Sequence, residues 1–125
     1  MTQNPNLAET SADSGVGTRL AHHMRDAVLG AVAPGPEFLQ GSIDADDMAK
    51  HMVKAVQGFE DHNRSEVQRL IDGEIPSTPE HVELWQALRE LYVCGSGYLA
   101  DRCDADCVAR TMTQMVHEFP PKKAS

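Results

Sequence analysis

Two segments of the chain repeat each other at a spacing of sixty residues, and this echo constrains the fold more than any other feature. Segment 43–59 aligns with segment 103–119. Asp44, Ala45, Asp46, Ala49, Met52, Val56 and Phe59 recur as Asp104, Ala105, Asp106, Ala109, Met112, Val116 and Phe119. The apolar members fall at helical spacing behind a capping aspartate, so the echo predicts one amphipathic helix design used twice.

The echo extends backwards at the same spacing. Met24, Ala27, Val28, Gly35, Phe38 and Leu39 lie over Leu84, Ala87, Leu88, Gly95, Tyr98 and Leu99. Two related helical hairpins, about 18–59 and 78–119, would then bury their apolar stripes against each other in a four-helix arrangement. Convergence is the alternative to duplication, because any two capped amphipathic helices share such residues.

Caps and breakers mark the ends of the expected helices. Expected N-caps are Thr18, Asp44, Thr78 and, for the last helix, Cys103 or Asp104. Expected breaks are Pro34-Gly35-Pro36, Gly73, Gly95-Ser96-Gly97 and Pro120-Pro121. Residues 44–72 form either one helix whose central part is exposed to solvent or two helices, since Gly58 and a polar run interrupt the apolar pattern. No alternating β-branched run is present, so the predicted fold class is all-α, with four to five helices in a compact bundle.

Length and composition bound the organisation. A chain of 125 residues fits one small domain, expected at 18–119, with a disordered polar segment at 1–17 and a tail at 120–125. No apolar window is long enough to span a bilayer, so no membrane partner is expected, and the start lacks the features of a secretory signal. The net charge of −8 argues against nucleic acid as a partner.

The three cysteines are Cys94, Cys103 and Cys107. Their odd number and the lack of an export signal indicate reduced thiols in a cytoplasm. Cys103 and Cys107 share a helical face, but the spacing matches no common zinc pattern and no fourth ligand is evident. Half-buried thiols are the preferred interpretation, and neither a metal nor a cofactor is predicted.

The dense polar run at residues 60–64, Glu-Asp-His-Asn-Arg, is the candidate for a catalytic role. Such runs are usually solvated helix breaks, and the six histidines form no metalloprotease pattern. The sequence therefore predicts a protein that is not an enzyme, with a metal-dependent enzyme as a distant alternative.

Residues 63–73, followed by Ile75-Pro76-Ser77 and the expected helix containing Trp85, resemble the recognition helix of small phage-repressor-type helix-turn-helix proteins. The resemblance implies that five side chains would face a DNA major groove: Asn63, Arg64, Ser65, Gln68 and Arg69. The turn region at 57–61 departs from the pattern of that family, and acidic neighbours leave no basic stripe. A DNA-binding transcriptional regulator is therefore the second hypothesis.

Protein binding is the first hypothesis. Methionines such as Met48 and Met52 line the expected apolar faces and suit adaptable contact surfaces. Trp85 and Tyr92 lie seven residues apart on one helical face and are candidate anchors for a partner or a second copy. We expect a small cytoplasmic regulator, adaptor or inhibitor that binds another protein and forms a homodimer.

Overall fold

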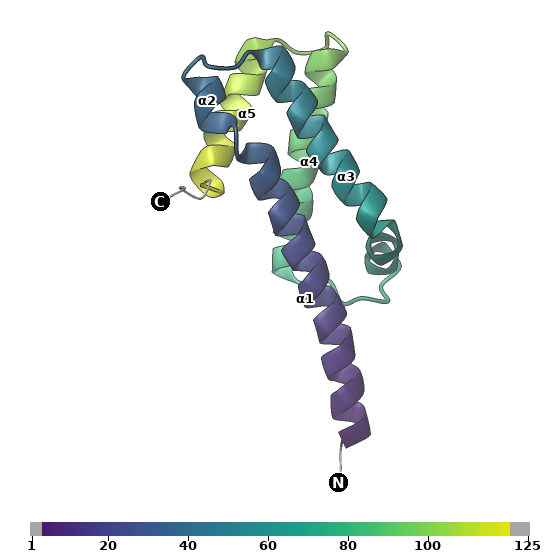
Figure 1. Ribbon diagram of the computed structural model, residues 1–125. Helices are drawn as coiled ribbons and strands as arrows, with labels where there is room; N and C mark the ends of the chain where they lie inside the picture. The colour runs from purple at the N-terminus through teal and green to yellow at the C-terminus, as the bar shows by residue number, and fades with distance from the viewer. Residues whose placement is uncertain (1–3, 121–125) are drawn as a thin grey trace.

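The computed structural model describes residues 4–120, with side chains from Gly15 onward. In this part of the chain all regular structure is helical, which confirms the all-α prediction. The helices are α1 (Asn4–Val32), α2 (Gly35–Leu39), α3 (Ala45–Ile71), α4 (Pro79–Leu99) and α5 (Ala105–Glu118). Figure 1 shows α1, α3 and α4 running alongside one another, while α2 and α5 pack together at one end of the bundle.

One hydrophobic cluster joins the long helices and α5. Its largest fully buried side chains include Leu20, Met24, Met48, Met52, Leu84, Leu88, Leu91, Met112 and Met115. Methionine supplies much of this core because its flexible thioether fills irregular gaps between helices. Met48 and Met52 are 0% exposed, so the expectation that they lie on a partner-binding face is wrong. The face of α3 that carries them is turned into the core.

The two turns that connect the helices within the repeated units have the same hydrogen bonds, sixty residues apart. The Ser42 N–H donates to the Glu37 carbonyl at 2.8 Å, and the Arg102 N–H donates to the Gly97 carbonyl at 2.7 Å. Inside each turn lies a second hydrogen bond that spans fewer residues. Together, the two bonds form a Schellman motif at the helix end. The echo is therefore a shared supersecondary unit in three dimensions.

The helix starts after these turns are also built alike. Asp44 accepts a hydrogen bond from the Asp47 N–H at 2.8 Å, and Asp104 accepts one from the Cys107 N–H at 3.1 Å. An ion pair follows one turn later in each copy, Lys50–Asp46 and Arg110–Asp106. The predicted caps at Asp44 and Asp104 are confirmed, as is the cap at Thr78.

Asp101 occupies the position that Gly41 occupies in the first turn. Both are left-handed, with φ of +63° for Asp101 and +89° for Gly41. A side chain in this conformation costs energy that glycine avoids, and a carboxylate at a helix C-terminus is also unfavourable. We expect Asp101→Gly to raise the free energy of unfolding by about 0.5–1 kcal/mol. Gly41→Asp should lower it by a similar amount. Equal signs for the two changes in urea unfolding would contradict this.

The first unit is interrupted where the second is continuous. Pro36 lies in the first turn of α2 and cannot donate a backbone hydrogen bond, so α1 stops at Val32. Ser96 is the equivalent residue in the second unit, and α4 runs through it to Leu99. The expected break at Gly95-Ser96-Gly97 is therefore wrong. These glycines lie inside α4, where Gly95 and Gly97 are buried against neighbouring segments.

The start of α1 differs from expectation, and the structure of α3 decides between the two alternatives for residues 44–72. Helix α1 begins at Asn4 and not at Thr18, with Pro5 in its first turn, a position that proline favours. Disorder of residues 1–17 in solution stays a prediction, and the tail beyond Pro120 lies outside the described residues. Residues 45–71 form one hydrogen-bonded helix with a kink at Asn63, whose φ is −125° and ψ is 22°.

Candidate functional site

Helix α4 is apolar on two faces. Its inner face packs into the core through Leu84, Leu88 and Leu91. Its outer stripe consists of Val82, Trp85, Tyr92 and Val93, and the charged Arg89 lies among them at the same helical spacing. Val82 is 49% exposed, Tyr92 36% and Val93 59%. A helix at a protein surface normally turns a polar face to water, so an apolar outer stripe indicates a surface that another molecule covers.

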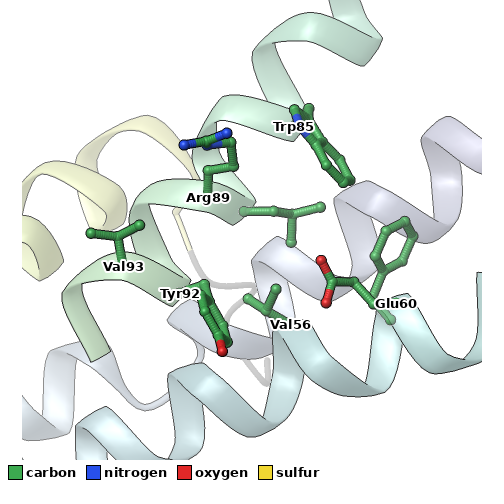
Figure 2. A pocket seen from close by; sticks show the side chains of 8 residues that line it. Val56, Glu60, Trp85, Arg89, Tyr92 and Val93 are labelled. Atoms are coloured by element: carbon green, nitrogen blue, oxygen red, sulfur yellow. The ribbon is translucent and has the colours of Figure 1, made fainter. Parts of the chain in front are cut away.

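A groove runs beside the outer stripe, between α3 and α4. Its lining residues are Val56, Phe59 and Glu60 from α3 with Trp85, Leu88, Arg89, Tyr92 and Val93 from α4. Figure 2 shows Trp85 and Tyr92 at opposite ends of this groove. The hollow measures about 270 Å³. This is below the usual range for pockets that enclose a drug-sized ligand and suits the insertion of a large apolar side chain.

The groove lining carries one charge of each sign, Glu60 from α3 and Arg89 from α4. Glu60 lies at its α3 side, and Glu83 and Glu90 are exposed on α4. Among the described residues, none of these three carboxylates is within ion-pair distance of a basic group, whereas Asp61 pairs with Arg64 at 3.1 Å. The surface therefore combines an apolar floor with charges of both signs at its rim, and two further exposed glutamates lie elsewhere on α4.

Both predicted aromatic anchors belong to this groove, but neither is central to the core. Trp85 is half-buried and packs against the edge of the hydrophobic cluster, while Tyr92 is partly open to solvent. Such residues lose little conformational entropy on binding and are frequent anchors in interfaces.

The residues named for DNA recognition are mostly engaged within the protein. Asn63 is buried at the kink of α3, where its Nδ2 donates to the Phe59 carbonyl at 3.0 Å. The His23 Nδ1 lies 2.8 Å from its Oδ1. Other pairs are Arg64 with Asp61, Arg69 with Glu74 and Gln68 with Asp72, while Ser65 is exposed. These contacts weaken the case for a basic surface that recognises DNA.

The polar run at residues 60–64 also forms local contacts. The His62 Nδ1 lies 2.8 Å from the Gly58 carbonyl of its own helix. With Asn63 buried at the kink and Arg64 paired one turn back, this run accounts for the bend in α3 without a catalytic arrangement. A non-catalytic protein stays a prediction.

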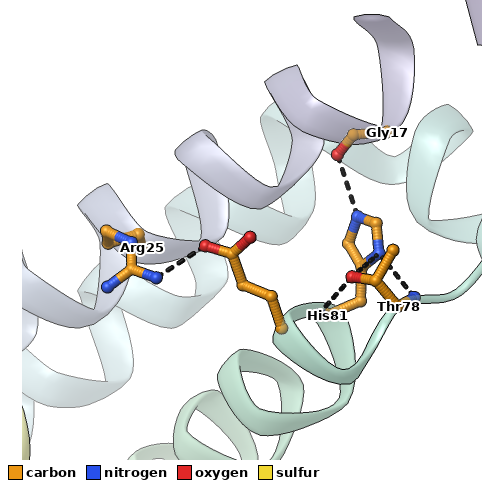
Figure 3. A network of polar contacts seen from close by, with 5 residues as sticks. Gly17, Arg25, Thr78 and His81 are labelled. Carbon is orange, nitrogen blue, oxygen red and sulfur yellow. Dashed lines mark hydrogen bonds and ion pairs between the residues drawn. The ribbon is translucent and has the colours of Figure 1, made fainter. Parts of the chain in front are cut away.

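Sequence reasoning missed a buried histidine that joins α4 to α1. His81 is 3% exposed, and its Nε2 lies 2.9 Å from the Gly17 carbonyl, while its Nδ1 accepts from the Thr78 N–H at 3.1 Å (Figure 3). Nearby, Arg25 pairs with Glu80 at 2.6 Å, and this hydrogen bond lowers the pKa of Glu80. The only sequence signal was the capping residue Thr78 three positions earlier.

The three cysteines converge at the turn between α4 and α5. Their sulfur atoms all lie within 4.8 Å of one another. Burial, followed by the neighbouring Cys107 thiol, raises the pKa of Cys103 to about 11, and burial also raises the pKa of Cys94. The thiols are half-buried or buried, as expected, but their clustering was not expected. The turn at Asp101 reverses the chain and brings Cys94 beside the other two.

In the part of the chain that the structure describes, no helix is long and apolar enough to cross a membrane. Comparisons with protein-family models, with curated proteins and with solved structures find no match. Function is therefore inferred from the surface of the molecule itself.

Proposed function

We propose that this protein is a small non-catalytic regulator, adaptor or inhibitor that binds a helical segment of another protein in the groove between α3 and α4. The observation that carries the proposal is the outer stripe of α4, where apolar and aromatic side chains face solvent beside a hollow of about 270 Å³. Burying this stripe against a partner removes apolar area from water, which is the main favourable term in association.

The spacing of the anchors favours a helix as the occupant. Trp85 and Tyr92 are seven residues apart on α4, which corresponds to about 10 Å along the helix axis. An amphipathic helix packed beside α4 places side chains at intervals of three and four residues against such a stripe. One large apolar side chain of that helix would enter the hollow between the two aromatic anchors.

Charge favours a helix with basic flanks. The rim carries Glu60 together with Arg89, while Glu83 and Glu90 are exposed elsewhere on α4 and the whole chain has a net charge of −8. Lysine or arginine residues beside the apolar stripe of the partner would meet this rim, which raises the association rate and selects against acidic competitors. Free thiols fit a cytoplasmic location for this complex.

The test is a titration of the full chain with helices selected from a display library of amphipathic sequences. We expect the selected helices to share an apolar stripe with basic flanks. Trp85→Ala should weaken their binding by about 30-fold or more, because a buried aromatic anchor contributes about 2 kcal/mol or more. Gln86→Ala, one residue along the same helix and exposed, is the matched control and should leave affinity unchanged.

Val93→Lys is a second variant, chosen because it should disturb folding less than Trp85→Ala. Val93 is 59% exposed, and lysine is a better helix former than valine. The added charge would oppose a basic partner, so binding should fall while thermal stability stays unchanged. If the selected helices bind the Trp85→Ala and Val93→Lys variants as tightly as the wild type, the proposal that they bind in the groove is refuted. A homodimer in light scattering that Val93→Lys dissociates would replace the partner helix by a second copy of the chain, as the sequence alone predicted.

A further inference from the structure

All three cysteines of the chain meet at one place, although Cys94 is thirteen residues from Cys107 in the sequence. Cys94 lies near the end of α4, Cys103 in the turn, and Cys107 in the first turn of α5. The Cys103 thiol donates to the Cys94 carbonyl at 3.6 Å. Three sulfur atoms within 4.8 Å of one another form a compact group of soft ligands.

The internal repeat provides a control for what the fold requires. In the first unit the residues at the equivalent positions are Pro34, Ile43 and Asp47. The turn there has the same Schellman hydrogen bonds and the same aspartate cap. The backbone of this turn therefore forms without sulfur at any of the three positions, so folding alone does not account for the thiols of the second unit.

We propose that Cys94, Cys103 and Cys107 bind a thiophilic divalent ion of the zinc and cadmium type through their three sulfur atoms. Zinc–sulfur bonds of about 2.3 Å in a tetrahedral site place the sulfur atoms roughly 3.8 Å apart. Sulfur atoms that already lie within 4.8 Å of one another reach this spacing through small side-chain rotations.

The fourth coordination position is open. Among the described residues, no histidine or carboxylate joins the three sulfur atoms in a group of ligand distance. Two surface hollows reach the cluster, one beside Cys103 and the other beside Cys94 and Cys107. Water or a ligand from another molecule therefore completes the site, the arrangement found where a metal ion keeps an exchangeable position.

Charged side chains of both signs line the two hollows beside the thiols. Three thiolates with a divalent ion carry a net charge of −1. Arg102 lines the hollow beside Cys103, and Arg89 lines the hollow beside the other two thiols. The N-terminus of α5, where Cys107 lies, adds the positive end of a helix dipole, while four carboxylates oppose these groups: Asp46, Asp101, Asp104 and Glu90.

The test is a titration of the reduced full chain with Cd²⁺ under argon, followed by the ultraviolet sulfur-to-cadmium charge-transfer band. We expect one ion per chain and a band that Cys103→Ile and Cys107→Ser each weaken, with affinity falling about 10-fold or more. Isoleucine is the residue that the first unit carries at the position of Cys103, so this variant should keep the fold. Ile43→Ser, at the matching position of the first unit, is the control and should leave the band unchanged.

The dependence on pH is a second measurement. The ion must displace protons from the thiols that bind it, so the apparent affinity should increase as the pH rises from neutral. No charge-transfer band in the reduced chain, or a band that survives both cysteine substitutions, would overturn the proposal. A disulfide between two of the three cysteines in protein isolated under argon would overturn it as well.

Discussion

Gly95→Val is expected to lower the free energy of unfolding by about 3 kcal/mol, because α3 packs directly against α4 at this glycine. A Cβ atom at Gly95 would lie 2.9 Å from the Ala49 carbonyl oxygen and 2.9 Å from the Val53 Cγ2. The carbonyl belongs to the backbone of α3 and cannot rotate away. Accommodating a side chain therefore requires the two helices to separate, which loosens the core around them.

Two other glycines make the comparison quantitative. Gly35 is the equivalent residue in the first unit, and its Cβ would meet only side-chain atoms, with Met112 Sδ at 2.7 Å and Val116 Cγ2 at 2.8 Å. Because methionine is flexible, Gly35→Val should cost less than Gly95→Val. Gly58→Ala, with nothing within 4 Å of its Cβ, should stabilise α3 by about 0.5–1 kcal/mol. Urea unfolding checks the order, and a Gly95→Val protein as stable as the wild type would contradict the packing described.

His81→Ala is expected to lower the free energy of unfolding by about 2–3 kcal/mol. The imidazole is buried, caps α4 through the Thr78 N–H and contacts the Gly17 carbonyl of α1. Alanine removes both contacts and leaves a cavity between the helices. His62→Ala is the matched control, since His62 is exposed and contacts only its own helix, so its effect should stay within about 0.5 kcal/mol.

His81→Gln separates the two roles of the imidazole. Glutamine is the usual partner in a capping box and can still reach the Thr78 N–H, but it would not restore the contact with α1. An intermediate loss of stability is therefore expected. If His81→Gln matches the wild type, the contact with Gly17 contributes nothing. If His81→Ala matches His62→Ala, the buried histidine does not tie α4 to α1.

Local signals in the sequence predicted the starts of α3, α4 and α5 correctly, although not that of α1. The caps at Asp44, Thr78 and Asp104 depend on a side chain and a backbone N–H three residues away, so no distant part of the chain is needed to recognise them. The similarity of the two turns could also be predicted, because matching residues recur sixty positions apart in the sequence. These features describe the frame on which the groove and the thiol cluster lie.

Features that depend on distant contacts were not predicted. Glycines at 95 and 97 suggested a break in a helix, but packing of Gly95 against α3 and of Gly97 against Cys103 compensates for their low helix propensity. The burial of Met48 and Met52, with Trp85 left at the edge of the core, depends on which neighbour each helical face meets. The cysteine cluster likewise depends on a left-handed residue, Asp101, that reverses the chain.

The most direct test of the proposed binding groove is a map of backbone amide chemical shifts in the isotope-labelled full chain, recorded while a selected basic amphipathic helix is added. We predict that the perturbed amides gather at residues 56–60 of α3 and 82–93 of α4. Perturbations centred on α2 and α5, or a spectrum that does not change at saturating helix, would contradict binding in the groove.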